Sequence, residues 1–183
     1  MNEIGRSNPV NRKADDEWER SVPYLHMNEH TVTRLFRRFD FGMKVRRLTP
    51  LTEGKRTTNY RVSAEGSATG GGERSFLLRV FVPGDDSWRR EAALRERLGG
   101  RVPMQRLLHM DRDDTIGDRT YAIYEYAEGD TLLKLLLAGY APEEALFREL
   151  GEAAAVIHGH RYERIGFLDG KLDVDSELPP LAQ

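Results

Sequence analysis

The segment from Phe76 to Leu98 restricts the possible folds of this chain more than any other. Its first part reads Phe-Leu-Leu-Arg-Val-Phe-Val and ends at a Pro-Gly turn, a pattern that predicts a strand buried on both faces. Arg79 lies in the middle of this strand, and because strand side chains alternate, it shares its face with Leu77 and Phe81. A buried charge is unfavourable unless it is paired. The sequence therefore predicts an anionic partner for Arg79.

The next part of the segment predicts a helix over residues 87–98, which supplies that partner. The residues able to cap its start are Asp85, Asp86 and Ser87. Gly99 ends it, and at 3.6 residues per turn Glu91 falls on the same stripe as Leu94 and Leu98. A cation in the strand and an anion on the inward face of the helix predict one ion pair. Such a pair holds a cation against nucleotide phosphates in protein-kinase-like folds, and a structural pair without a ligand is the alternative.

Length and composition limit the class of protein. The 183 residues carry a net charge of -2, which argues against a nucleic-acid-binding protein. The absence of cysteine excludes a disulfide framework and a thiolate metal site. No apolar run approaches the roughly 20 residues that span a bilayer, and no signal-peptide core opens the sequence. These features predict a soluble cytoplasmic protein with no membrane partner.

The N-terminal part of the chain divides near residue 28. Residues 1–27 are polar and lack a sustained periodicity, which predicts a flexible extension. A helix capped by Asn28 follows, because apolar residues recur at helical spacing after it. Its outer face begins a basic cluster of Arg34, Arg37, Arg38, Lys44, Arg46 and Arg47. A solvated surface explains this cluster better than a nucleic-acid site, since no aromatic residues interleave for base stacking.

Five strands are predicted, with the Phe76 strand as the third. They cover residues 44–51, 57–64, 75–82, 102–108 and 119–126. The glycine-rich residues 66–72 are predicted as a flexible hairpin connection, and residues 111–118 as a loop. Five antiparallel strands with one helix inserted after the third indicate an α+β fold.

Beyond residue 126 the pattern becomes helical. A helix at 132–137 is predicted to be capped by Asp130, and Pro142 fits the first turn of a longer helix. The apolar stripe of the longer helix consists of Leu146, Leu150, Ala153 and Ile157. No strong element is predicted over residues 165–183. The leucine-rich segment 131–138 and the stripe predict exposed apolar surface, and hence self-association or a separate partner chain.

Six pieces of the sequence, in this order, resemble the aminoglycoside phosphotransferase and choline kinase-like superfamily, small-molecule kinases with the protein-kinase fold. They are the first hairpin at 51–62, the third strand at 76–80, Arg90-Glu91 in the ion-pair helix, the hinge and Glu-Gly-x-x-Leu at 121–132, the long helix at 150–158, and Gly-Phe at 166–167. The resemblance covers about residues 45–167. It implies a kinase-like N-lobe at 28–126, followed by a hinge and the truncated start of a helical C-lobe at 127–183.

The same resemblance implies a binding site for ATP. The residues that it places there are Gly54, Thr58, Asn59, Arg79, Glu91, Glu125, Tyr126 and Ala127. The loop of the first hairpin resembles the family's loop that covers the nucleotide phosphates. Thr57 stands where the family usually has asparagine, so a phosphate-binding role depends more on Gly54 and on backbone amides.

The remaining implied contacts come from the central strand and the hinge. By resemblance, Arg79 lies near the phosphates and Glu91 fixes it; arginine is a frequent alternative to lysine at this position of the family. The hinge resemblance implies that adenine bonds to backbone groups of Glu125 and Ala127. The expected cofactor is therefore ATP.

The family's catalytic loop has no counterpart in this sequence. That loop reads His-Gly-Asp followed by an asparagine, and a later aspartate holds magnesium. In His158-Gly159-His160 the aspartate is replaced by His160, and Ile165 stands at the asparagine position. We therefore expect the ATP-binding portion of a kinase that phosphorylates an unassigned small hydroxylated acceptor. Alone, this portion is not expected to catalyse transfer, and Mg²⁺ is expected only when a C-lobe is supplied.

Two alternatives from other classes stay open. A non-catalytic, pseudokinase-like interaction module predicts ATP binding without magnesium dependence. A nucleic-acid-associated domain that uses the basic cluster predicts salt-sensitive binding, lost on Arg37→Glu and Arg46→Glu.

Two groups of residues have the chemistry of metal ligands. They are Asp169, Asp173 and Asp175 in one group and His26 and His30 in the other. Solvated side chains explain both better, because neither group has the further ligands that a metal cage requires.

Overall fold

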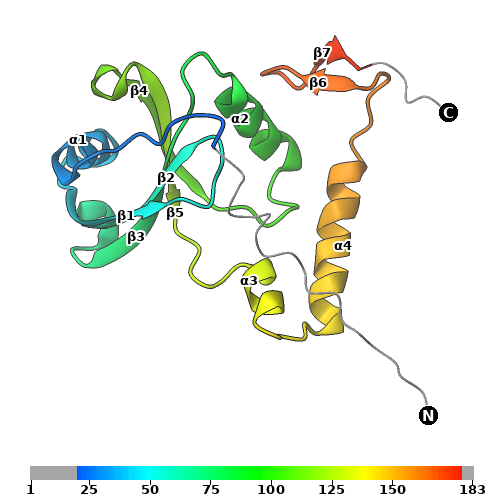
Figure 1. The fold of residues 1–183 in the computed structure, drawn as a ribbon, viewed down its shortest axis with the longest axis horizontal. Coiled ribbons are helices and arrows are strands. Elements are labelled where there is room, and N and C mark those ends of the chain that lie inside the picture. The colour runs from blue at the N-terminus through cyan, green and yellow to red at the C-terminus, as the bar shows by residue number, and fades with distance from the viewer. Residues whose placement is uncertain (1–19, 179–183) are drawn as a thin grey trace.

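The computed structural model describes residues 20–178 (Figure 1). In chain order the elements are α1 (Glu29–Phe39), β1 (Lys44–Leu51), β2 (Thr58–Glu65), the 3₁₀ turn Ser67–Thr69, β3 (Glu73–Val80), α2 (Ser87–Leu98), β4 (Leu107–Asp113), the 3₁₀ turn Asp114–Ile116, β5 (Arg119–Glu125), α3 (Leu132–Leu137), α4 (Glu144–His158), β6 (Gly166–Leu168) and β7 (Val174–Glu177). The first five strands form one antiparallel sheet in the order β1-β2-β3-β5-β4. The predicted α+β fold, with a helix inserted after the third strand, is confirmed.

The central strand β3 is buried on both faces, as its sequence predicts. On one face, α1 packs with Val32, Leu35 and Phe36 fully buried, and Phe76 and Leu78 of β3 join the same cluster. The Asn28 side chain caps α1 by accepting a hydrogen bond from the backbone N–H of Thr31, at 2.9 Å.

The opposite face of the sheet lies toward α2. Its buried cluster contains Leu77, Phe81, Ala122 and Tyr124, with Trp88 of α2 packed against it. Arg79 belongs to this face, since strand residues two apart point the same way. The charged site is therefore built on the α2 side of the sheet.

Segment 20–27 is the described part of the predicted N-terminal extension, and it does not stand free of the lobe. Its backbone and side chains bind the β1–β2 loop and β2; for example, the Leu25 N–H donates to the Thr58 hydroxyl at 3.0 Å. Tyr24 also packs edge-on against Tyr60, with 5.3 Å between ring centroids. Within residues 20–27 tertiary contacts therefore hold a segment that has no periodicity of its own. Residues 1–19 lie outside the described residues.

Strand β4 continues to Asp113, so the prediction of a loop from residue 111 is wrong at its start. Asp111 pairs with Tyr121 and Asp113 with Arg119 in the ladder to β5. Both aspartates also form ion pairs with arginines of α1, Asp111 with Arg38 and Asp113 with Arg34. These partners come from distant parts of the chain and stabilise a strand whose acidic composition favours a loop.

The cap of α3 and the start of α4 differ from those predicted. The N-cap of α3 is Thr131, whose hydroxyl accepts from the Lys134 N–H, whereas Asp130 forms an ion pair with the Lys134 side chain. Helix α4 begins at Glu144, so Pro142 precedes it instead of occupying its first turn. At α3 a neighbouring residue of similar capping chemistry takes the cap position, and α4 begins two positions after Pro142.

The residues after α4 form a hairpin, which corrects the prediction that residues 165–183 hold no strong element. Strands β6 and β7 pair antiparallel. The Asp169 carboxylate accepts hydrogen bonds from the N–H groups of Lys171 and Asp173, at 2.7 and 3.0 Å, and so organises the turn. Leu172 adopts a left-handed backbone with φ 68° and is buried. Strands this short carry too little periodicity to be recognised in a sequence.

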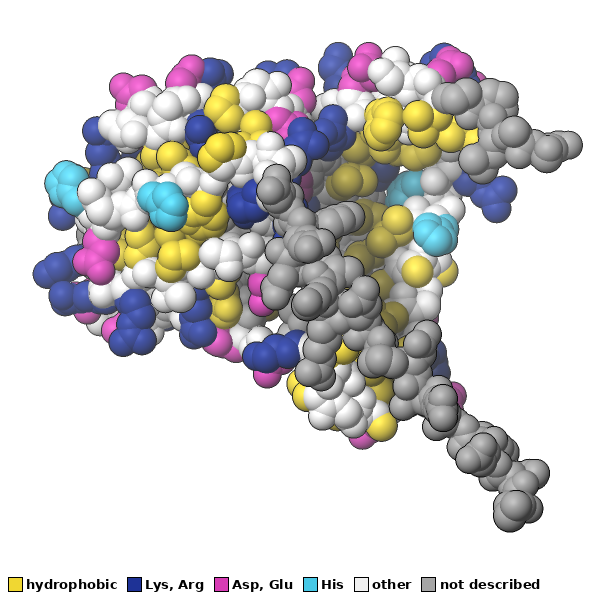
Figure 2. All heavy atoms as spheres, viewed as in Figure 1, with side chains coloured by type: hydrophobic (Ala, Val, Ile, Leu, Met, Phe, Trp, Pro, Cys, Tyr) yellow, Lys and Arg dark blue, Asp and Glu magenta, His cyan; other side chains and the backbone are white. Residues whose placement is uncertain are grey.

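Exposed apolar side chains are concentrated on the helical part, as predicted, and hydrophobic side chains are visible along α4 at the surface in Figure 2. Those of α3, α4 and the following residues are Leu133, Leu136, Leu137, Tyr140, Phe147, Leu150, Ile157, Tyr162, Ile165, Phe167 and Leu178. None of the helices within residues 20–178 has the length and apolar character to cross a membrane.

Candidate nucleotide-binding site

The predicted ion pair between β3 and α2 is present. Arg79 Nη1 lies 2.8 Å from Glu91 Oε2, and the two side chains are 29% and 23% exposed. The exposed fractions show that the pair borders solvent instead of being sealed in the core. A guanidinium held in this way can bind an anionic ligand while its ion pair with the carboxylate stays intact.

Two further residues hold Glu91, and sequence reasoning did not include them. The Tyr124 hydroxyl donates to Glu91 Oε1 at 2.6 Å, and Arg95 Nη2 donates to the same oxygen at 3.1 Å. The guanidinium groups of Arg79 and Arg95 both lie over the Tyr124 ring, 5.4 and 4.9 Å from its centroid. The i, i+4 spacing of Glu91 and Arg95 is a signal that the sequence contained. Tyr124 has no such signal because its position depends on strand register.

This surrounding keeps Glu91 ionised. Burial raises its pKa, but the hydrogen bond from Tyr124 and the charges of Arg79 and Arg95 lower it by more, so the pKa of Glu91 lies below its ordinary value. Burial and the bond to Glu91 raise the pKa of Tyr124. The tyrosine therefore keeps its proton at neutral pH and donates a hydrogen bond to the ionised Glu91.

Asn59 connects the ion pair to the β1–β2 loop. It lies opposite Arg79 in the ladder between β2 and β3, and its Oδ1 accepts from Arg79 Nε at 3.2 Å. Its Nδ2 donates to the Thr57 hydroxyl at 3.3 Å. A Cβ added to Gly54 would lie 3.0 Å from Asn59 Nδ2, so only glycine fits here without displacing the amide. The structure thus brings Gly54, Asn59, Arg79 and Glu91 together.

Thr58 is a predicted residue of β2 whose side chain does not join this group. It is 3% exposed and bonded to the Leu25 N–H. Because neighbouring strand residues point to opposite faces, its side chain lies on the α1 side while Asn59 lies on the α2 side. The resemblance identified the segment but not the face.

The β1–β2 loop is also attached to the start of α2. Arg56 Nη2 lies 2.9 Å from Asp85 Oδ2, and the Asp85 side chain is 6% exposed. Asp85 accepts hydrogen bonds from the Ser87 N–H and hydroxyl, at 2.9 and 3.0 Å, so it is the side chain that caps α2, one residue before the N-cap position Asp86. Arg90, 3.6 Å from Asp85, also donates to the Leu168 carbonyl of β6 at 3.1 Å.

The predicted hinge begins at the last residue of β5, Glu125, and continues with Tyr126 and Ala127. The Glu125 N–H donates to the Arg106 carbonyl at 2.9 Å. The Tyr126 ring lies 4.5 Å from the Arg61 guanidinium. Glu125 and Tyr126 line a cavity of about 570 Å³ together with Phe76, on the α1 side of the sheet and hence opposite Arg79. That cavity is not the space between the hinge and the ion pair.

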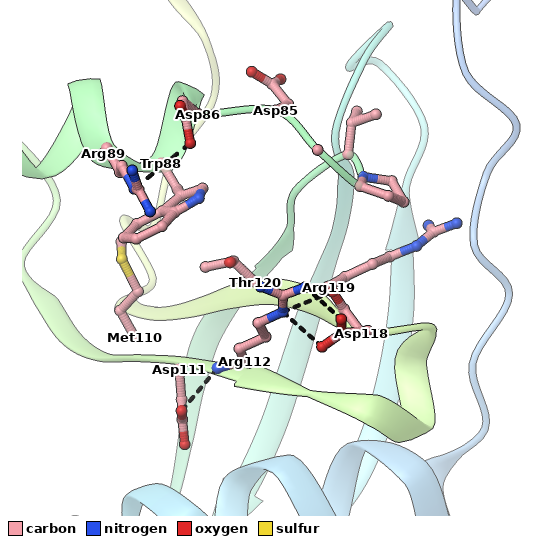
Figure 3. A pocket seen from close by; sticks show the side chains of 13 residues that line it. Asp85, Asp86, Trp88, Arg89, Met110, Asp111, Arg112, Asp118, Arg119 and Thr120 are labelled. Carbon is pink, nitrogen blue, oxygen red and sulfur yellow. Dashed lines mark hydrogen bonds and ion pairs between the residues drawn. The ribbon is translucent and has the colours of Figure 1, made fainter. Parts of the chain in front are cut away.

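A separate cavity of about 520 Å³ lies between the start of α2 and strands β4 and β5 (Figure 3). None of the predicted site residues lines it. Its charged side chains pair with one another, Asp86 with Arg89 and Arg112 with Asp118, and Arg89 also covers the Trp88 ring at 4.9 Å. These charged side chains are thus satisfied within the protein, whereas the buried Nε of Arg119, which also lines the cavity, has no hydrogen-bond partner among the described residues.

The basic cluster is partly neutralised by acidic neighbours. Arg34 pairs with Asp113 and Asp114, and Arg38 with Asp111. Arg46 pairs with Glu65 of β2. These ion pairs reduce the positive potential that a nucleic-acid site requires. Within residues 20–178, no three metal-ligating side chains converge, and the Asp169 carboxylate is engaged by backbone N–H groups.

The chain matches one protein family by sequence and resembles solved structures of one enzyme. The sequence matches the model of the phosphotransferase enzyme family over residues 47–179. No curated protein matches the sequence. Among solved structures, aminoglycoside phosphotransferase APH(4)-Ia is similar, with a TM-score of 0.54 and 22% identity over 81% of this chain and 47% of that chain.

Two ligand complexes of a thermostable mutant of that enzyme are also similar. One is a ternary complex with ADP and hygromycin B, with a TM-score of 0.52 and 20% identity over 80% of this chain and 46% of that chain. The other contains AMP-PNP and hygromycin B, with a TM-score of 0.51 and 20% identity over 78% and 44%. The chain spans less than half the length of these structures, and at this identity the likeness concerns the fold.

Proposed function

Because the chain belongs to the phosphotransferase enzyme family, we propose that its N-lobe binds the ATP of an enzyme that phosphorylates a small hydroxylated acceptor. The observation that carries this proposal is the partly exposed Arg79–Glu91 pair, joined through Asn59 to the loop between β1 and β2. The similar structures that contain ADP or AMP-PNP support the choice of nucleotide.

The residues on the α2 side of the sheet fit the charge of a triphosphate. Arg79 supplies a cation that Glu91 orients, and the loop containing Gly54 supplies backbone amides. Beside them, the backbone of Glu125 and Ala127 is proposed to bind adenine. When bound, the nucleotide supplies the phosphoryl group for transfer, and the protein's part in this lobe is to bind and orient it.

Magnesium and acceptor activation are not assigned to residues of this sequence. The pattern His-Gly-Asp does not occur in the 183 residues, and the described residues contain no cluster of metal ligands. We therefore propose that these residues bind ATP without a strong dependence on magnesium, which is also what a pseudokinase-like module would do. Transfer would require catalytic groups supplied from elsewhere.

Calorimetric titration with ATP, with and without Mg²⁺, tests the proposal. We expect binding by the wild type and a loss of about tenfold or more in affinity for Arg79→Ala, since a charge-assisted hydrogen bond contributes about 1.5–3 kcal/mol. Arg89→Ala is the matched control, because Arg89 lies on α2 and pairs with exposed Asp86 instead of Glu91. Equal ATP affinities of the wild type and Arg79→Ala would contradict the assignment.

The exposed apolar side chains of α3 and α4 are proposed to be covered by a helical lobe or by a second copy of the chain. Leu133, Leu137 and Phe147 are 65%, 73% and 55% exposed. Sedimentation velocity at increasing concentration should show association, and Leu137→Gln with Phe147→Gln should weaken it. A monomer at all concentrations that does not bind a hydrophobic dye would refute this part of the proposal.

A further inference from the structure

Arg20 makes a contact that the nucleotide site described above does not explain. Its guanidinium donates to two carbonyl groups of the β1–β2 loop, Nη1 to Gly54 in the middle of the loop and Nη2 to Thr57 at its end, the second at 3.0 Å. It also lies over the Tyr24 ring, 5.1 Å from the centroid. One side chain thus clamps two carbonyls of a loop that is more than thirty residues away in the sequence.

The residues after Arg20 continue this attachment along the loop and β2. The Ser21 N–H donates to the Lys55 carbonyl at 3.2 Å. The Tyr24 hydroxyl donates to the Asn59 carbonyl. The Tyr60 hydroxyl accepts from the Met27 N–H at 3.1 Å and donates to the Leu25 carbonyl at 2.8 Å. Segment 20–27 therefore binds loop and strand through a nearly continuous series of hydrogen bonds.

These contacts orient the peptide groups of the loop. In a trans peptide the C=O and the following N–H point in opposite directions. Because the carbonyls of Gly54 and Lys55 are directed to segment 20–27, the N–H groups that follow them are directed away from it. Successive N–H groups that point the same way form a concave site for anions. By binding the carbonyls of the loop, segment 20–27 thus also orients the loop N–H groups toward the side on which an anion can bind.

The clamp connects to the charged pair through a single residue. Asn59 has its carbonyl bound by Tyr24 and its side-chain oxygen bound to Arg79 Nε at 3.2 Å. Its amide nitrogen reaches Thr57, whose carbonyl is bound by Arg20. Arg20, the loop and Arg79 are therefore parts of one hydrogen-bonded network.

We infer that Arg20 is a positioning residue for the proposed nucleotide site: with segment 20–27 it holds the β1–β2 loop in the conformation that binds phosphates. The inference depends on the proposed function for its ligand, but the clamp on the loop can be measured without any ligand. Without the clamp, ATP must order the loop when it binds, and fixing one residue's backbone costs about 1–2 kcal/mol.

The experiment combines ATP titration with amide hydrogen exchange of the full chain. In the absence of nucleotide, Arg20→Ala should increase exchange within residues 52–58 and leave β3 unchanged. Its ATP affinity should be about tenfold weaker than that of the wild type, in proportion to the ordering that the ligand must then supply. Arg20→Lys, which retains the charge, should recover part of the affinity. Arg37→Ala, an exposed arginine on α1, is the control and should change neither measurement.

The possible results separate a failure of the inference about Arg20 from a failure of the proposed function. Unchanged exchange within residues 52–58 in Arg20→Ala overturns the clamp. Faster exchange with unchanged ATP affinity shows a structural clamp and overturns the positioning role. If the wild type binds no ATP, the proposed function fails and the positioning role fails with it, while exchange still shows whether Arg20 holds the loop. If Arg20→Ala unfolds, Arg20→Lys and Tyr24→Phe, which removes only the hydroxyl bound to Asn59, provide the same comparison.

Discussion

The five-stranded lobe and the helices that follow it differ in what covers their apolar side chains. On α1, Val32, Leu35 and Phe36 are fully buried against the sheet. Helix α4 also has an apolar stripe, yet it has no buried residue, and Leu150 is 48% exposed. A helix in water gains most of its stability from packing of its apolar face. The first region therefore carries its own core, whereas the second presents a face whose stability depends on a partner.

Amide hydrogen exchange should show this difference most strongly. We expect amides of β3 to exchange through global unfolding, and those of α3 and α4 through local opening, with protection lower by about a thousandfold or more. Exchange measured by mass spectrometry on peptides from both regions tests this. Equal protection would show that the helices are covered in solution.

Two phenylalanines on helices provide the next comparison. Phe36→Ala on α1 should lower the free energy of unfolding by about 3–5 kcal/mol, because it empties a fully buried site. Phe147→Ala on α4, where the side chain is 55% exposed, should change it by about 0.5 kcal/mol or less. Urea unfolding followed by circular dichroism measures both. A large effect at Phe147 would mean that a second copy already buries it.

A comparison of two glutamates tests the electrostatic part of the lobe. Glu91→Gln should lower stability at pH 7 by about 1.5–3 kcal/mol, since the carboxylate accepts hydrogen bonds from Arg79, Arg95 and Tyr124. Glu149→Gln, exposed on α4, should have no measurable effect. The two variants isolate the contribution of the charge at the ion pair.

The effect of Glu91→Gln should also depend on pH. The folded pKa of Glu91 lies below its ordinary value of 4.5, so the stability that its charge contributes is complete above that value and is lost as the pH falls through the folded pKa. The stability difference between wild type and Glu91→Gln should therefore decrease below about pH 4.5. A difference that stays constant from pH 7 to pH 3 would contradict the lowered pKa.

The smallest effect is expected from the two helix caps. Asn28→Ala removes the cap of α1 and should lower the free energy of global unfolding by about 1 kcal/mol. Thr131→Ala removes the cap of α3, and global unfolding should not change, because α3 is not part of the buried core. Thermal unfolding of both variants tests the point. Equal losses would show that α3 unfolds together with the sheet.

The sequence allowed the ion pair of the site to be predicted but not the groups around it. Arg79 and Glu91 were recognised because a charge in an apolar strand and a charge on an inward helical stripe both break a periodic pattern. Tyr124 fits the apolar pattern of its strand, so nothing local marks its hydroxyl as a partner of Glu91. Its role follows only from the register that aligns β5 with β3.

Segment 20–27 shows the same limit at a greater distance along the chain. Its residues have no periodicity, and flexibility was therefore the expectation. The hydrogen bonds that hold it, such as those of Arg20 to the β1–β2 loop, join residues that only the folded sheet brings together. Likewise, the acidic end of β4 is a strand because its partners come from α1.

By itself, the sequence determined the helices, the strands β1, β2, β3 and β5, the α+β class and the presence of an Arg–Glu pair at the centre of the lobe. These depend on periodicity, capping and turn residues, which act within a few residues of chain. The tertiary structure alone decided the strand order, the face on which Thr58 and Asn59 lie, the attachment of segment 20–27 and the exposure of α4. The physical reason is that these properties depend on contacts between segments that are distant in the sequence. Such contacts form, and stabilise the protein, only when the whole lobe packs.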